Sequence, residues 1–71
     1  MKIAIIGQGY VGLTISIFAS QHFEVVGLDS NQKVVDALNQ GISHIEGVDS
    51  SKLQQAIKSK KYRATSRESD I

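Results

Sequence analysis

The apolar positions of this chain form short unbroken runs that alternate with helical stripes. Ile3 to Ile6 is an unbroken apolar run, typical of a strand that is buried on both faces of a parallel sheet. A helix is predicted from about Tyr10 to Gln21, because apolar residues recur there at helical spacing on two faces. One face carries Val11, Ile15, Phe18 and Ala19, and the nearly opposite face carries Leu13 and Ile17. A helix that is apolar on two sides is expected to have neighbours on both.

A second strand and a second helix follow. The strand is Glu24 to Leu28, and Gly27 within it is interpreted as a glycine that admits close packing. Ser30 or Asn31 can cap the next helix, which is predicted to stop at Gly41, a natural left-handed terminator. The inner face of that helix carries Val34, Val35 and Leu38.

The last third of the chain predicts a loop, a short helix and a weaker strand. The loop runs from Ile42 to Asp49, and Asp49 or Ser50 is the expected cap of the helix after it. Tyr62 to Ser66 predicts the third strand, and Arg67 to Ile71 could start another turn or helix. The apolar stripe of the short helix is Leu53, Ala56 and Ile57.

Three glycines directly after the first strand are spaced G-x-G-x-x-G. In this motif Gly7 permits the tight turn out of the strand, Gly9 lets a pyrophosphate approach the backbone, and Gly12 lets the helix pack close to the strand. The free amides of Tyr10 and Val11, at the start of the helix, then point at the phosphates, and the helix dipole adds to the attraction.

Asp29 ends the second strand twenty residues after Gly9. A carboxylate at this point accepts hydrogen bonds from the adenosine ribose hydroxyls. Its charge would repel a 2′-phosphate and no arginine follows it, so NAD is favoured over NADP. Taken separately, the glycines could form a turn without a ligand, and Asp29 could be a helix cap. Together, in strand context and at this spacing, they predict a dinucleotide site.

The order strand–helix–strand–helix–helix–strand predicts an α/β fold, a partial Rossmann unit with three parallel strands in the order 3-2-1. Right-handed crossovers that step the same way place all the helices on one face of the sheet. The other face and the far edge of the first strand would be open, as in a truncated doubly wound sheet. Exposed apolar area and an unpaired edge predict self-association.

The composition narrows the choices further. The chain has 71 residues, a formal net charge of +1 and no cysteine. This length allows one small domain, and neither disulfides nor a metal cluster is expected. No basic face accumulates, which argues against nucleic acid as the main partner. Met1-Lys2 leads straight into a strand and no apolar run is long enough to span a membrane, so we expect no signal peptide, no membrane partner and a cytoplasmic location.

The run Gly7 to Leu13 resembles the start of the UDP-glucose/GDP-mannose 6-dehydrogenase family, whose usual form is G-x-G-Y-V-G-L-P. The likeness covers essentially the whole chain and is greatest to the branch that oxidises UDP-N-acetylhexosamines. It continues through Val25–Asp29, Val35–Gly41, Ser43–Glu46, Val48-Asp49, Leu53 and Arg63–Thr65.

The resemblance implies a nucleotide-sugar dehydrogenase that oxidises C6 in two steps, with two NAD molecules in turn and a cysteine thiohemiacetal. It implies a pyrophosphate held by Gly7, Gly9, Tyr10, Val11 and Gly12, and a ribose held by Asp29. Thr14 departs from the usual proline. Val34 stands where a basic residue commonly contacts the ribose, and the adjacent Lys33 is the candidate substitute. Ser43–Glu46 is interpreted as a packed loop.

The catalytic cysteine, lysine and sugar-binding residues of that family lie far beyond position 71, so no catalytic residue is assigned here. The chain is interpreted as an N-terminal fragment, residues 1–71, of the NAD-binding domain. The UDP-sugar would be a partner only of the full-length parent. Two alternatives stay open: a fragment of another dehydrogenase with the same unit, and a non-catalytic nucleotide-sensing module like those that gate potassium transport.

Overall fold

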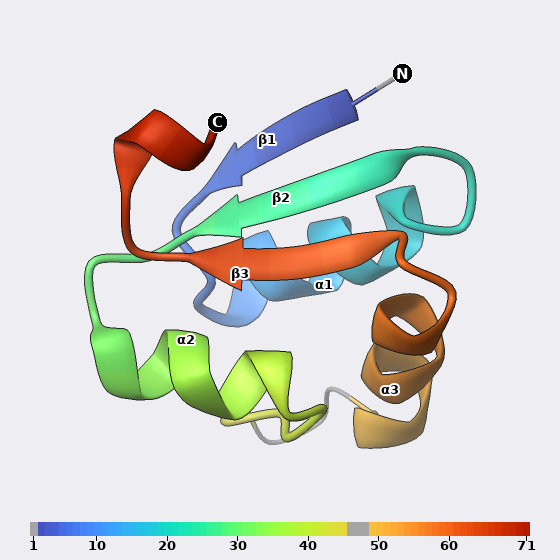
Figure 1. Ribbon diagram of the computed structural model, residues 1–71. Helices are drawn as coiled ribbons and strands as arrows, with labels where there is room; N and C mark the ends of the chain where they lie inside the picture. Colours follow the sequence, from blue (N-terminus) through green and yellow to red (C-terminus); the bar gives the residue numbers. More distant parts are fainter. Residues whose placement is uncertain (1, 46–48) are drawn as a thin grey trace.

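The computed structural model describes residues 2–45 and 49–71. Its elements follow the order β1, α1, β2, α2, α3, β3 and a final 3-10 turn, η1, as predicted (Figure 1). Glu46 and Val48, which belong to the family resemblance, lie outside the described residues.

Three parallel strands form the sheet, in the spatial order β1-β2-β3. The strands are β1 (Lys2–Ile6), β2 (Glu24–Leu28) and β3 (Tyr62–Thr65). The predicted order 3-2-1 is therefore confirmed. β3 ends one residue earlier than the predicted Ser66, because the hydroxyl of Thr65 turns to accept the backbone N–H of Arg67 (3.2 Å).

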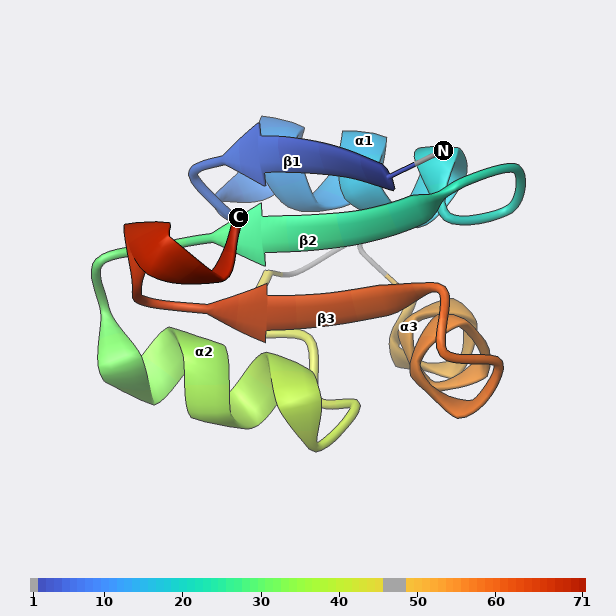
Figure 2. The same cartoon turned by 45° about the horizontal axis from the view of Figure 1, so that its top comes forward.

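All three helices cover one face of the sheet, as right-handed crossovers require (Figures 1 and 2). They are α1 (Tyr10–Ala19), α2 (Gln32–Asn39) and α3 (Ser50–Lys58). Asn31 and Asp49 are the caps of α2 and α3, each accepting a backbone N–H two residues on. No helix in the part of the chain described is both long and apolar enough to cross a membrane.

Two helix ends can be compared with the prediction. α1 stops at Ala19 and not at Gln21, because the carbonyl of Ala19 accepts the N–H groups of His22 and Phe23 and reverses the chain. The predicted stop at Gly41 is confirmed: this glycine follows α2 with φ = 80°.

The core lies between the sheet and the helices. One apolar face of α1 contributes to it, with Leu13 (0% exposed) and Ile17 (7%) buried there, so the expectation that this helix has neighbours on both faces is not met among the described residues. Val11, Ile15 and Phe18 on the opposite face are 50–68% exposed. The polar Ser16 is fully buried on the same face as Leu13, and its hydroxyl lies 3.1 Å from the Oε1 of Gln8. The buried apolar set is Leu13, Ile17, Val25, Val35, Leu38, Leu53, Ala56, Tyr62 and Ala64.

The other face of the sheet carries only η1 (Glu68–Asp70) among the described elements (Figure 2). Asp70 fastens this turn by bonding to the side chains of Thr65 and Arg67. Ile6, on this face, is 70% exposed. This exposure corrects the interpretation of the apolar run as a strand buried on both faces, and it agrees with the expectation that the second face of the sheet is open.

Candidate functional site

The glycine turn lies between β1 and α1, at the carboxyl end of the sheet. Gly7 has φ = 84°, a left-handed conformation that favours glycine, and its N–H donates to the carbonyl of Leu28 (2.6 Å). α1 begins at Tyr10, and Gly9 is its N-cap in extended conformation. The predicted sequence of strand, glycine turn and helix is therefore present, and the turn is tied to the end of β2.

The space around Gly9 and Gly12 differs as the motif requires. A Cβ added at Gly9 would meet no atom within 4 Å, so the backbone there faces open space. A Cβ added at Gly12 would lie 1.8 Å from the carbonyl oxygen of Gly7. Gly12 thus lets the helix approach the turn, and Gly9 leaves room for a group the size of a phosphate.

The start of α1 offers unpaired backbone donors. The first N–H groups of any helix lack a partner inside it, and a glycine cap has no side chain to supply one. The residues that carry these donors, Tyr10 and Val11, are 63% and 66% exposed. An anion above Gly9 would meet these amides and the positive end of the helix dipole.

Asp29, at the end of β2, faces the glycine turn. Its Oδ2 accepts the N–H of Gln8 and its Oδ1 accepts the N–H of Asn31, both at 2.9 Å. These two donors, Asn31 first and Gln8 second, hold the pKa of the carboxyl below its usual range. Asp29 is therefore an ionised, half-buried acceptor beside Gly7, in an open pocket of about 330 Å³.

Lys33 lies in the first turn of α2, and its side chain is exposed. The backbone N–H of Lys33 donates to the side chain of Asn31, the N-cap of α2. The structure thus places Lys33 on the helix that follows Asp29, and a ribose contact from it stays a prediction.

The described part of the Ser43–Glu46 segment packs onto the protein. Ile45 lies against the core, and the Ser43 N–H donates to the hydroxyl of Ser50 (3.1 Å). Glu46 lies outside the described residues.

Sequence reasoning missed the side chain between the first two glycines. Gln8 is completely buried, and it fills the space that Gly27 leaves open: a Cβ on Gly27 would lie 2.4 Å from the Gln8 carboxamide. The expected close packing at Gly27 is therefore confirmed. The one signal available in the sequence was Ser16, a polar residue on the same helical face as Leu13 and Ile17.

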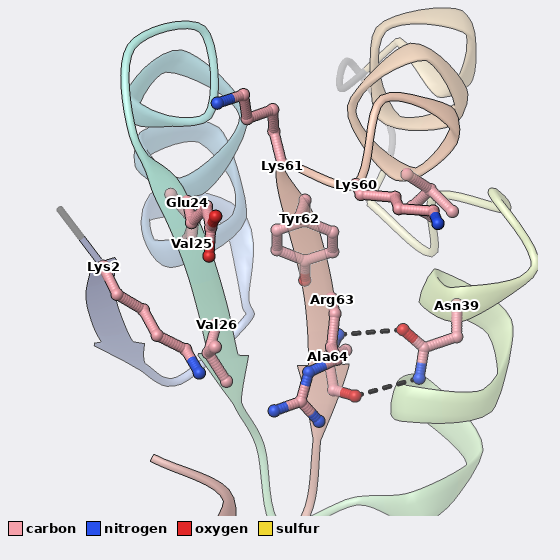
Figure 3. Close-up of a pocket in the computed structure, with 11 residues that line it drawn as sticks. Lys2, Glu24, Val25, Val26, Asn39, Lys60, Lys61, Tyr62, Arg63 and Ala64 are labelled. Carbon is pink, nitrogen blue, oxygen red and sulfur yellow. Dashed lines mark hydrogen bonds between the residues drawn. The ribbon is translucent and has the colours of Figure 1, made fainter.

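A larger pocket, of about 480 Å³, lies at the opposite end of the sheet (Figure 3). Lys2, Glu24 and Tyr62, the first residues of the three strands, line it. None of the predicted site residues lines this pocket. Ligands of open parallel sheets bind at the carboxyl ends of the strands, which favours the glycine turn as the site.

Comparison with known proteins gives one family. The model of the family described as "UDP-glucose/GDP-mannose dehydrogenase family, NAD binding domain" matches residues 1–71. A UDP-N-acetyl-D-mannosamine dehydrogenase from Campylobacter jejuni is 51% identical over 45 residues, or 62% of this chain and 11% of that enzyme. An NDP-N-acetyl-D-galactosaminuronic acid dehydrogenase from Ralstonia nicotianae is 46% identical over 65 residues, or 89% of this chain and 15% of that enzyme.

The fold agrees with a solved relative. The structure of a UDP-D-ManNAc dehydrogenase from Pyrococcus horikoshii superposes with a TM-score of 0.87 and 38% identity, covering 99% of this chain and 17% of that one. The chain therefore spans between 11% and 17% of the length of these three relatives.

Proposed function

The chain belongs to the UDP-glucose/GDP-mannose dehydrogenase family, within its NAD-binding domain, and from this premise we propose that it forms the adenosine-binding half of an NAD site. In this proposal residues 1–71 are the N-terminal part of the NAD-binding Rossmann domain of a longer enzyme. The observation that carries it is the pairing of an open, glycine-capped helix start with an ionised carboxylate that bonds to the same turn.

Each residue of the site has a separate task in this proposal. Gly7 and Gly12 shape the turn, and the N–H groups of Tyr10 and Val11 hold the pyrophosphate above Gly9. Asp29 accepts hydrogen bonds from the adenosine ribose and disfavours a 2′-phosphate, and Lys33 adds a contact to the same ribose. When bound, NAD supplies the hydride acceptor.

The longer enzyme is proposed to oxidise the C6 hydroxyl of a nucleotide sugar to a carboxylate. The relatives named as N-acetylhexosamine nucleotide dehydrogenases support a UDP-N-acetylhexosamine as its substrate. The 71 residues contain no cysteine, so the thiohemiacetal chemistry implied for the family is not assigned to them. The cytoplasmic location expected from the sequence is kept in this proposal.

We also propose that copies of the chain associate through the edge of β1. Among the described residues no strand pairs with this edge, and an unpaired edge presents a row of free N–H and C=O groups. A second copy related by a two-fold axis can pair its own β1 there. The exposed apolar side chain of Ile6, on the open sheet face, would lie next to such an interface.

Calorimetric titration of the purified chain with NAD, ADP and NADP tests the cofactor assignment. NAD and ADP are expected to bind with similar, weak affinity, because the proposed contacts are to the adenosine half. NADP is expected to bind more weakly than NAD. Asp29→Asn, which keeps the size of the side chain but removes its charge, should lower NAD affinity roughly tenfold, the scale of a lost charge-assisted hydrogen bond.

Asp36→Asn is the matched control. Asp36 is exposed on α2 and bonds to Gln32 there, so the same loss of charge should leave NAD affinity unchanged. A folded wild-type chain that binds neither NAD nor ADP would overturn the proposal, as would equal losses in the two variants.

A further inference from the structure

A buried hydrogen-bond network anchors the glycine turn from below. The Oε1 of Gln8 lies 2.7 Å from the hydroxyl of Tyr62 and 3.1 Å from the hydroxyl of Ser16. The Nε2 of the same carboxamide donates to the carbonyls of Gly7 (2.9 Å) and Ile5 (3.2 Å). One side chain thus connects the turn to α1, through Ser16, and to β3, through Tyr62, 54 positions away.

The network is sealed from solvent. Gln8 and Ser16 are 0% exposed and Tyr62 is 3% exposed. Leaving one of these buried polar groups without a partner would lower the free energy of unfolding by about 1–3 kcal/mol. The folded chain therefore favours the arrangement in which all of these hydrogen bonds are made. Gly27 makes it sterically feasible, because any side chain there would displace the carboxamide.

The donors and acceptors fix the orientation of the Gln8 carboxamide. The Tyr62 hydroxyl donates its proton, so it must face the carboxamide oxygen of Gln8. The carboxamide nitrogen then points toward the carbonyl of Gly7, to which it donates. Burial raises the pKa of the Tyr62 hydroxyl, so it keeps its proton and stays a donor at neutral pH. The Ser16 hydroxyl also lies 2.8 Å from the carbonyl of Gly12, and its single proton is divided between two acceptors. Tyr62 is therefore the stronger anchor.

We propose that Tyr62 and Ser16 are positioning residues of the dinucleotide site, acting through Gln8. They hold the backbone from Gly7 to Gly9 in the shape that leaves the space above Gly9 open. Both side chains are buried, so neither reaches the space above Gly9 itself. The expected loss of cofactor affinity rests on the proposed function. The other part of the inference, that the network holds the shape of the turn, concerns the ligand-free chain.

Tyr62→Phe removes the hydroxyl and keeps the ring, and amide NMR spectra of the chain report on the result. In the ligand-free variant the amide resonances of Gly7, Gln8 and Gly9 should shift, because the carboxamide loses the donor that orients it. NAD affinity, measured by calorimetry at a temperature where the variant is fully folded, should fall roughly three- to tenfold, the scale of one lost hydrogen bond.

Ser20→Ala is the matched control, because Ser20, the C-cap of α1, also has a buried hydroxyl but bonds to the carbonyl of Ile17, at the far end of the helix. It should leave the turn resonances and the affinity unchanged. If Tyr62→Phe does not fold, Ser16→Ala supplies the same two measurements, with a smaller expected change.

The two proposals can fail separately. Turn resonances that stay in place in a folded Tyr62→Phe or Ser16→Ala chain overturn the positioning role, whatever the affinity. Shifted turn resonances in a chain whose wild type binds no NAD uphold the network and reject the proposed function. Shifted resonances with wild-type affinity for NAD overturn the link between the network and the site.

Discussion

Asp29 holds two backbone segments at once, and this governs how substitutions there act. One carboxylate oxygen bonds to the glycine turn at Gln8, and the other bonds to the start of α2 at Asn31. Removing the side chain would therefore loosen the turn and the helix start, besides any contact with a ribose. Asn keeps the volume but has one acceptor oxygen, so Asp29→Asn gives up one of these two backbone bonds as well as the charge, whereas truncation of the side chain gives up both.

Alanine substitutions at two glycines of the turn, Gly12 and Gly9, are expected to have different effects. Gly12→Ala gains about 1 kcal/mol of helix propensity but places a methyl group 1.8 Å from the Gly7 carbonyl, where overpacking costs about 1–3 kcal/mol or more. The clash involves rigid backbone far inside contact distance, so the upper end of this cost applies, and the free energy of unfolding in urea should fall by about 2 kcal/mol or more.

Gly9→Ala is expected to affect NAD binding and to leave stability almost unchanged. Its φ of −75° suits alanine and its Cβ would meet open space, so stability should change by less than about 1 kcal/mol, the usual cost of a poorer cap. NAD affinity should drop tenfold or more, because the methyl group takes the space assigned to the pyrophosphate. A Gly9→Ala chain that binds NAD normally would contradict this placement of the phosphates.

At the scale of elements, the outer edge of β3 is closed by a side chain of α2 (Figure 3). The carboxamide of Asn39 accepts the N–H of Ala64 (2.8 Å) and donates to the carbonyl of the same residue (2.9 Å). It thus replaces the hydrogen bonds that a neighbouring strand would make. At Ala64 the edge of β3 therefore offers no free backbone groups to a further strand.

Asn39→Ala should therefore destabilise the chain by about 1–3 kcal/mol, since both backbone groups of the buried Ala64 lose their partner. Urea unfolding followed by circular dichroism measures the change. Gln40→Ala, at the exposed neighbouring position, should stay within about 0.5 kcal/mol of wild type. Equal effects of the two substitutions would show that the edge contact contributes nothing.

At the scale of the whole molecule, the two edges of the sheet differ. The edge of β3 is blocked at Ala64 by Asn39, and the edge of β1 has no strand beside it among the described residues. The helices cover one face, and the other face exposes Ala4 and Ile6. This asymmetry directs the proposed self-association to β1.

The prediction is that the weight-average mass of the wild-type chain rises with concentration in sedimentation experiments. Ala4→Lys should keep the chain monomeric, because Ala4 is the central residue of β1 and two copies would bring like charges together. Gln21→Lys adds the same charge beyond the end of α1 and should leave the association unchanged. A wild-type chain that stays monomeric at high concentration contradicts the proposed interface.

The sequence by itself determined the elements, their order and the site motif. Apolar runs, helical spacing and caps such as Asn31 and Asp49 are local signals, so they could be placed without knowledge of the fold. The spacing of Gly7, Gly9, Gly12 and Asp29 predicted that a carboxylate would meet the glycine turn, because parallel strands bring their carboxyl ends to one edge. The structure has that arrangement.

Only the tertiary structure decided which face of α1 is buried and what supports the turn. Both faces of the helix are apolar, so periodicity could not choose between Leu13 and Val11, and in the structure the buried face is the one that also carries Ser16. The partners of Gln8 are eight and 54 positions away, on α1 and β3. Such contacts depend on how the elements pack, and no local pattern of residues encodes them.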